Sequence, residues 1–273
     1  MAIHETLAAF PVLTTVALRV FIAAAALWAY AAMAGLPVAH TARFWWNSFL
    51  VGFFNNTMTF VLIAWGQTHI TSGLTGILNT STAFFAALLA ALAFPDERFD
   101  LIKLVGLCLG LAGVSAVVGP SALTDLDITS LAQLAVVGAG LSNAIGAILG
   151  RHVLSGVPPE VSAAATLTMA ALVLCPAAVI LEGLPEIPPP SALVALLYLA
   201  LVPTAFGFLL YYRVLTKVGA GHTGLVTLLI APIAAILGAI ILNEELGLGA
   251  LAGMALLSLG LLLIDGRILR WQQ

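Results

Sequence analysis

Nine long apolar runs constrain the fold of this chain more than any other feature of its sequence. Each run has close to 20 residues and little or no charge. An α-helix needs roughly 20 mostly apolar residues to cross a bilayer, because every backbone N–H and C=O group must be paired within it. The runs cover residues 10–34, 45–66, 70–94, 101–119, 129–150, 160–181, 191–212, 219–242 and 247–264. The sequence therefore predicts an all-α membrane protein, a polytopic bundle of nine transmembrane helices.

The composition supports this prediction and excludes several classes of function. Apolar residues make up 62% of the chain and charged residues 8%, whereas soluble domains have about half and a quarter, respectively. Both cysteines, Cys108 and Cys175, lie inside apolar runs, so no disulfide framework is implied. The chain has no basic patch, Gly-rich phosphate loop or cluster of metal ligands. We therefore expect no nucleic-acid partner, no cofactor and no metal.

The basic residues predict an orientation in the membrane. Lys and Arg favour the cytoplasmic ends of spans. All nine except Arg19 fall at alternate connections or in the C-terminal tail: Arg43, Arg98, Lys103, Arg151, Arg213, Lys217, Arg267 and Arg270. This alternation predicts a cytoplasmic C-terminus and, with nine spans, an external N-terminus. Because no export signal precedes that N-terminus, we expect a chain that starts one span late, through a gene-start error or as a genuine nine-span variant.

The sequence also carries a weak internal repeat. A shift of 147 residues places Leu50 over Leu197 and aligns five further pairs: Thr57 with Thr204, Thr80 with Thr227, Glu97 with Glu244, Gly106 with Gly253, and Gly113 with Gly260. The charge pattern gives the two copies opposite orientations. Inverted repeats are a recurring construction of secondary transporters. We therefore predict two inverted halves, residues 1–119 with four spans and 129–266 with five.

The second half carries the clearest family resemblance. It reads VPTAFGFLLYYRVLTKVGAGHTGLVTLLIAPIAAILGAIILNEELGLGALAGMALLSLGLLL, with a mid-helix Pro232, an acidic turn and a last helix led by glycine. This pattern resembles the EamA-like members of the drug/metabolite transporter superfamily, and the first half reads similarly from Pro11 to Val118. The resemblance implies ten helices in two five-helix halves and alternating-access transport, often export, of amino acids or related metabolites. The first helix of that pattern is absent here, and Phe85 stands where the second half has Pro232.

Polar residues inside the spans are the candidate substrate-binding groups, because polar groups in hydrocarbon usually face a cavity or another helix. Their spacing places several on shared helix faces. The candidates are Asn55, Asn56, Thr59, Thr75, Asn79, Thr82, Asn143 next to Ser142, and Thr223 and Thr227 near Pro232, where we expect a helix kink. Two interpretations stay open. The residues either line the path of a zwitterionic substrate or form interhelical hydrogen bonds of about 0.6 kcal/mol each.

Several other polar residues have structural interpretations. Tyr211, Tyr212 and Trp65 lie near predicted span ends, which favours an aromatic belt at the membrane surface. For Arg19 we favour ion pairing or snorkelling over substrate contact. Acidic and amide residues before the last helix of each half are interpreted as caps of that helix: Asp96, Glu97, Asn243 and Glu244. The GxxxG patterns, such as Gly106 with Gly110, are attributed to packing within one protomer.

Together these observations predict a secondary transporter of small polar metabolites, with amino acids as the leading class, in the inner membrane. Its partners are the lipid bilayer and a small-molecule substrate, and we expect a monomer or a weak homodimer. No span has a carboxylate at its middle, which favours gradient-driven export over a carboxylate-based proton antiport. The alternatives are a non-transporting scaffold or receptor and an intramembrane enzyme. The spans offer no nucleophile–base pair for an enzyme.

Overall fold

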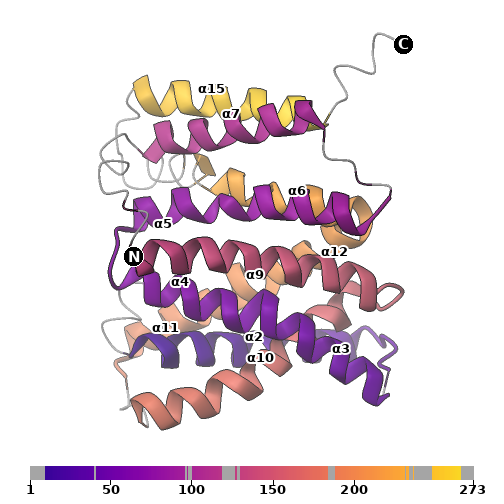
Figure 1. The fold of residues 1–273 in the computed structure, drawn as a ribbon. Coiled ribbons are helices and arrows are strands. Elements are labelled where there is room, and N and C mark those ends of the chain that lie inside the picture. The colour runs from indigo at the N-terminus through magenta and orange to yellow at the C-terminus, as the bar shows by residue number, and fades with distance from the viewer. Residues whose placement is uncertain are drawn as a thin grey trace. The chain divides into compact units, whose positions relative to one another are not determined.

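The structure, a computed structural model, is a bundle of helices (Figure 1). It describes residues 10–39, 41–95, 97, 100–118, 127, 130–183, 188–230, 232–233, 236 and 248–265. Within these ranges seven helices are long and apolar enough to cross a membrane, and two shorter apolar helices cover Ala220–Ile230 and Leu248–Ile264. The prediction of a polytopic helical membrane protein is therefore confirmed.

Several predicted spans contain more than one helical segment. The elements are α2 (Val12–Met33), α3 (Ala42–Gly52), η1 (Phe53–Met58), α4 (Thr59–Gln67), α5 (Ser72–Asn79), α6 (Ser81–Ala93), α7 (Leu101–Val118), α9 (Leu131–Val153), α10 (Pro159–Glu182), α11 (Pro190–Leu199), η2 (Ala200–Phe206), α12 (Gly207–Val218), α13 (Ala220–Gly224) and α15 (Leu248–Asp265). Of these, η1 and η2 are π-helical. Single π-helical turns inside α-helices are rare and often mark functional sites.

The helices form two compact units, each built from both ends of the sequence. Unit 1 comprises Met1–Ala64 and Ile145–Gly219, and unit 2 comprises Trp65–Ala144 and Ala220–Gln273. Each unit therefore takes helices from both predicted halves of the chain. We describe the two units separately.

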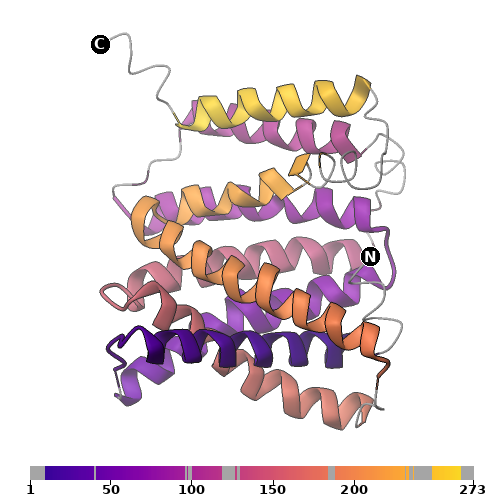
Figure 2. The same ribbon diagram turned by 180° about the vertical axis from the view of Figure 1, so that it is seen from behind.

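In unit 1, α2 packs against α10, and the segment of α11, η2 and α12 crosses α2 (Figure 2). The C-terminal Glu182 of α10 accepts hydrogen bonds from the backbone N–H groups of Leu13 and Thr14, at 2.9 and 2.7 Å. A carboxylate there satisfies unpaired N–H groups and the helix dipole. The N-terminus of α2 thus lies at the C-terminus of α10, so the two helices are antiparallel.

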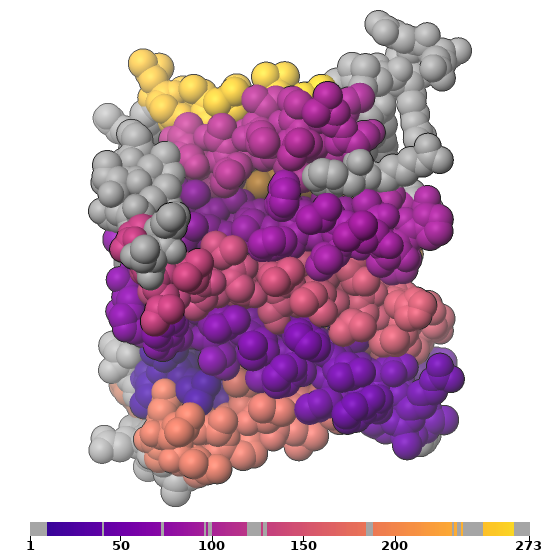
Figure 3. All heavy atoms as spheres, viewed as in Figure 1, coloured from indigo at the N-terminus to yellow at the C-terminus, as the bar shows by residue number. Residues whose placement is uncertain are grey.

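In unit 2, α7 and α15 pack along their length (Figure 3). A Cβ atom added at Gly106 would lie 2.7 Å from the carbonyl oxygen of Gly260, and one added at Gly113 would lie 2.7 Å from that of Gly253. This pairing makes α7 and α15 antiparallel and brings their backbones into direct contact. We call these four residues the glycine seam. The interpretation of these glycines as packing sites within one protomer is confirmed for this helix pair.

The predicted role of Glu97 as a cap of the helix that follows it is wrong. Its carboxylate instead accepts hydrogen bonds from the backbone N–H groups of Ala220 and Gly221, at 3.0 and 2.9 Å, and so caps α13. At the start of α7 the side chain of Asp100 accepts from Lys103 N at 2.8 Å. Sequence spacing pointed to the nearest helix, whereas the carboxylate reaches one 123 residues away along the chain. The other three predicted caps, Asp96, Asn243 and Glu244, lie outside the described residues.

Four pairs of elements share the spacing of the sequence repeat. Helices α2 and α10, segments η1 and η2, and helices α7 and α15 each begin 147 residues apart, and α3 and α11 end 147 residues apart. Helix breaks were not predicted at Thr80, between α5 and α6, or at Leu225, after α13. Pro232 is helical and buried, but Ala231 and Ala234 on either side lie outside the described residues, so its kink stays a prediction.

Candidate functional site

The arginine of unit 1 lies within a membrane-spanning helix. Arg19 is seven residues from the start of α2, about 10 Å along the helix axis. Its Nε–H donates a 2.6 Å hydrogen bond to Thr204 Oγ1, and its guanidinium carbon lies 5.0 Å from the centre of the Phe60 ring. Among the residues that the structure describes, Arg19 has no acidic partner. The expected ion pair is thus not formed with any of them.

A proline explains why Thr204 can hold the arginine. Pro203 lacks the N–H group that would bond the carbonyl of Leu199 four residues earlier in an α-helix. The hydroxyl of Thr204 donates to that carbonyl at 2.7 Å instead. Because the hydroxyl proton is used in this way, its oxygen is left to accept from Arg19. The π-helical turn η2 therefore positions an acceptor for the guanidinium.

Aromatic rings connect this arginine to an asparagine on η1. The Phe60 ring lies 6.1 Å from that of Phe208, which lies 5.9 Å from that of Tyr211. The hydroxyl of Tyr211 accepts a 3.0 Å hydrogen bond from Nδ2 of Asn55. Edge-to-face and tilted aromatic pairs at such distances are favourable. We call the following residues of unit 1 the polar-aromatic cluster: Arg19, Asn55, Phe60, Thr204, Phe208 and Tyr211.

Two neighbours of Asn55 are buried polar groups without a partner. Asn56 is fully buried and Thr57 is 5% exposed. Among the described residues, neither Oδ1 and Nδ2 of Asn56 nor Oγ1 of Thr57 has a hydrogen-bond partner. An unpaired buried polar group costs about 1–3 kcal/mol. Such a cost is typical of positions where water or a ligand completes the bonding.

Two predicted site residues of unit 2 make bonds within their own helices. The Thr75 hydroxyl donates to Thr71 O at 3.0 Å, and the Thr227 hydroxyl donates to Gly224 O at 2.8 Å. Threonines in helices often bond back in this way. These contacts do not require a substrate.

The other predicted residues of unit 2 lie close to the helix breaks or on α9. The Thr82 hydroxyl and Asn79 Oδ1 are 3.5 Å apart across the break at Thr80. Thr223 is buried at the end of α13, and Asn143 is half-buried on α9 beside the buried Ser142. Asn79, Thr82, Thr223 and Asn143 therefore stay predictions for substrate contact.

The structure thus divides the predicted residues between the units. Asn55, Asn56 and Thr59 belong to unit 1, where the Thr59 hydroxyl bonds Phe54 O at 2.9 Å. The remaining candidates belong to unit 2: Thr75, Asn79, Thr82, Asn143, Thr223 and Thr227. Of all these, only Asn55 contacts the polar-aromatic cluster through a hydrogen bond that joins two distant parts of unit 1.

The aromatic-belt interpretation is wrong for two tyrosines. Tyr212 is 1% exposed and donates a 3.1 Å hydrogen bond to Thr166 Oγ1, and Tyr211 contacts Asn55. Trp65 is 44% exposed, and its role in the belt stays a prediction. The sequence did hold a signal for the cluster, because Thr204, Phe208 and Tyr211 follow the i, i+4, i+7 spacing of one helix face.

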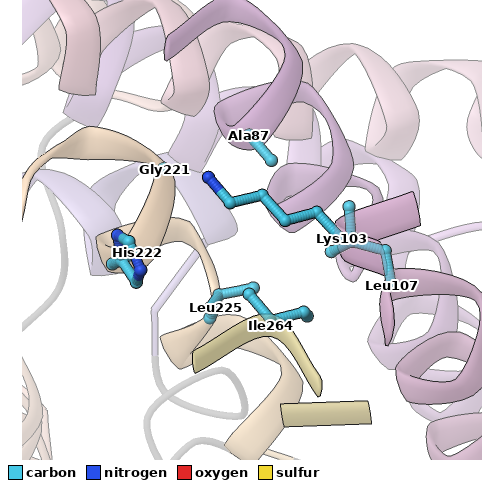
Figure 4. A pocket seen from close by; sticks show the side chains of 7 residues that line it. All are labelled: Ala87, Lys103, Leu107, Gly221, His222, Leu225 and Ile264. Carbon is cyan, nitrogen blue, oxygen red and sulfur yellow. The ribbon is translucent and has the colours of Figure 1, made fainter. Parts of the chain in front are cut away.

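A small pocket in unit 2 does not fit a metabolite. Its volume is about 10 Å³, the space of one water molecule, and it is lined mainly by apolar residues. Figure 4 shows the Lys103 side chain extending toward Gly221, with the His222 ring on the other side of the pocket. Within the described part of the chain, no three His, Cys, Asp or Glu side chains are grouped so that they could hold a metal ion.

Comparison with known proteins decides the family. The profile of the EamA-like transporter family matches residues 1–119 and 130–265. The chain belongs to this family. It is 26% identical over 217 residues to an uncharacterized transporter of Archaeoglobus fulgidus, covering 79% of this chain and 76% of that one.

Two further similarities extend this result. The chain is 29% identical over 211 residues to a probable terminal-alkyne amino-acid exporter of Streptantibioticus cattleyicolor, covering 77% of this chain and 69% of that one. One solved structure, described only as "Crystal structure of protein", has a TM-score of 0.80 with 18% identity, covering 96% of this chain and 90% of that one. The solved structure shows the fold alone. From its family and named relatives, the chain is a multi-pass membrane transporter and not an enzyme.

Proposed function

We propose that this EamA-like transporter is a secondary carrier that exports amino acids or their derivatives across the inner membrane by alternating access. The polar-aromatic cluster carries the proposal. Its arginine, amide and two hydroxyl groups lie in membrane-spanning helices of unit 1. Charged and polar groups at such positions are costly unless they contact a partner or line a substrate path.

The repeated geometry supports alternating access. Elements spaced by 147 residues form antiparallel pairs in each unit, α2 with α10 and α7 with α15. Two halves of opposite topology can exchange inward-open and outward-open shapes about a site near the membrane midplane. The alternating basic residues favour a cytoplasmic C-terminus in this arrangement.

Two observations support the substrate class and the monomeric state. The relative from Streptantibioticus cattleyicolor is named a probable amino-acid exporter, and the cluster combines a cation with neutral polar and aromatic groups, which suits a small zwitterion with a carbon side chain. The glycine seam is used within one chain, which favours a monomer over a dimer. We propose that substrate contacts come from Asn55, Asn56 and Thr59 of unit 1, and from Thr75, Asn79, Thr82, Asn143, Thr223 and Thr227 of unit 2.

The test is uptake of labelled amino acids into inverted membrane vesicles that contain the protein. Inverted vesicles convert export into uptake, so at least one amino acid or derivative should accumulate above vesicles that lack the protein. The exporter of Streptantibioticus cattleyicolor serves as the positive control. If that control accumulates its solute while this chain accumulates none across a broad panel, the proposal fails and a non-transporting scaffold becomes the better interpretation.

A further inference from the structure

We propose that Arg19 binds the carboxylate of the transported solute and thereby makes the carrier selective for monocarboxylates over their uncharged or cationic analogues. This inference rests on the proposed function, because it assigns the solute group that the polar-aromatic cluster recognises. It gives Arg19 a substrate contact in place of the pairing or snorkelling expected from the sequence.

Charge balance in unit 1 is the first argument. A guanidinium in a membrane-spanning helix needs an anion or water to offset the loss of hydration. Unit 1 has two described acidic residues. Glu160 accepts from Arg213 Nη2 at 2.6 Å, and Glu182 caps the N-terminus of α2. Both acids are therefore engaged elsewhere, and Arg19 is left as a cation without a described counter-charge.

The geometry of the guanidinium is the second argument. Thr204 fixes Nε, and the ring of Phe60 lies near the guanidinium at 5.0 Å, a distance typical of a cation–π contact. Neither Nη atom of Arg19 has a hydrogen-bond partner among the described residues. A guanidinium can offer a carboxylate two parallel N–H groups. The contacts at Nε and on the ring hold the group in place while its terminal nitrogens stay available to a ligand.

The surroundings favour an organic monocarboxylate over an inorganic anion. A single cation offsets one negative charge, which suits a carboxylate better than a doubly charged phosphate. Phe60 and Phe208 extend from the arginine toward Tyr211, whose hydroxyl meets Asn55. Apolar and aromatic surface with a few fixed polar groups is the usual lining of a small-molecule site. These rings suit the carbon skeleton of a solute held at Arg19 by its acid group.

The test compares matched solutes in proteoliposomes that contain the purified full-length protein. Each pair consists of an L-amino acid and its carboxamide, which differ only at the acid group. We expect the wild type to transport at least one acid about tenfold or more faster than its amide, since losing one charge-assisted contact changes affinity by at least that factor. Arg19→Gln should lower acid transport to the rate of the amide, and Arg19→Lys should restore part of the difference because it keeps the charge.

Arg43→Gln is the matched control, because Arg43 is exposed at the start of α3 and its loss removes the same charge. It should keep the preference for the acid. Equal transport of acid and amide by the wild type would overturn the inference without any variant, as would an unchanged preference in Arg19→Gln; both results leave the carrier function intact. If no member of any pair crosses the membrane, the proposed function is overturned together with the inference.

Discussion

The two units solve the problem of packing helices in a membrane in different ways. In unit 2, the glycine seam lets α7 and α15 approach until their backbones touch, with Leu107 and Val114 buried beside it. In unit 1, two π-helical turns interrupt the helices, and a cation and an unpaired amide lie inside the unit. Local rules are broken where function requires it. The comparison assigns the α7–α15 pair of unit 2 a scaffold role and the cluster of unit 1 a ligand-binding role.

The largest effect should come from filling the glycine seam. In Gly113→Val, the new Cβ would lie 2.7 Å from both Gly253 O and Leu257 N, and backbone atoms cannot move away as a flexible side chain can. Overpacking a tight core costs about 1–3 kcal/mol or more. We expect a large loss of folded protein, measured as the monodisperse fraction after purification and as the thermal unfolding midpoint.

Gly249→Ala is the control for this prediction, since its nearest neighbour is Ala116 O at 3.7 Å, an ordinary contact. It should fold like the wild type. If Gly113→Val kept the wild-type yield and midpoint, the contrast between a tightly packed unit 2 and a polar unit 1 would lose its main support.

A smaller effect, mainly on transport, should follow from Thr204→Val. This change removes both the acceptor for Arg19 Nε and the donor to Leu199 O. A hydrogen bond to a charged group contributes about 1.5–3 kcal/mol, so transport should fall by about tenfold or more. Thr204→Ser keeps the hydroxyl and should keep most of the rate. Thr216→Val, which removes an exposed hydroxyl of α12, should leave transport unchanged.

The smallest effects concern two polar residues of unit 2 with different roles. Asn79→Leu should lower transport severalfold, because Asn79 is a predicted substrate contact at a helix break. Glu97→Gln should instead lower the unfolding midpoint, since the carboxylate caps α13 and such contacts contribute up to about 2 kcal/mol when partly buried. Transport per folded molecule and thermal stability should be measured for both. A larger loss of transport in Glu97→Gln would contradict the proposed pocket at Asn79.

The fold could be predicted largely from hydrophobic run length. Seven of the predicted spans are long apolar helices, and the 147-residue spacing of the sequence repeat recurs in the helix boundaries. The π-helical turns and the break at Thr80 could not be predicted, because they depend on which carbonyl a hydroxyl or N–H reaches. Pro203 was the visible signal for η2, whereas η1 contains no proline.

The site could be predicted only in part. Asn55 was selected as a polar residue inside a span, and it does contact the polar-aromatic cluster. Tyr211 and Tyr212 were missed because the predicted span ended at residue 212, whereas the helical segment continues to Val218 and places both rings inside it. Arg19 was noticed but misinterpreted, since no sequence pattern reveals that Glu160 and Glu182 have other partners.

The most direct test of the central claim is counterflow in proteoliposomes. Vesicles containing the purified protein are loaded with an unlabelled amino acid that the vesicle assay identifies, and a trace of the same labelled solute is added outside. An alternating-access carrier exchanges solute across the membrane, so we predict that internal solute accelerates entry of the label and produces a transient accumulation above equilibrium. Entry that is independent of internal solute, or that never exceeds equilibrium, would contradict the account.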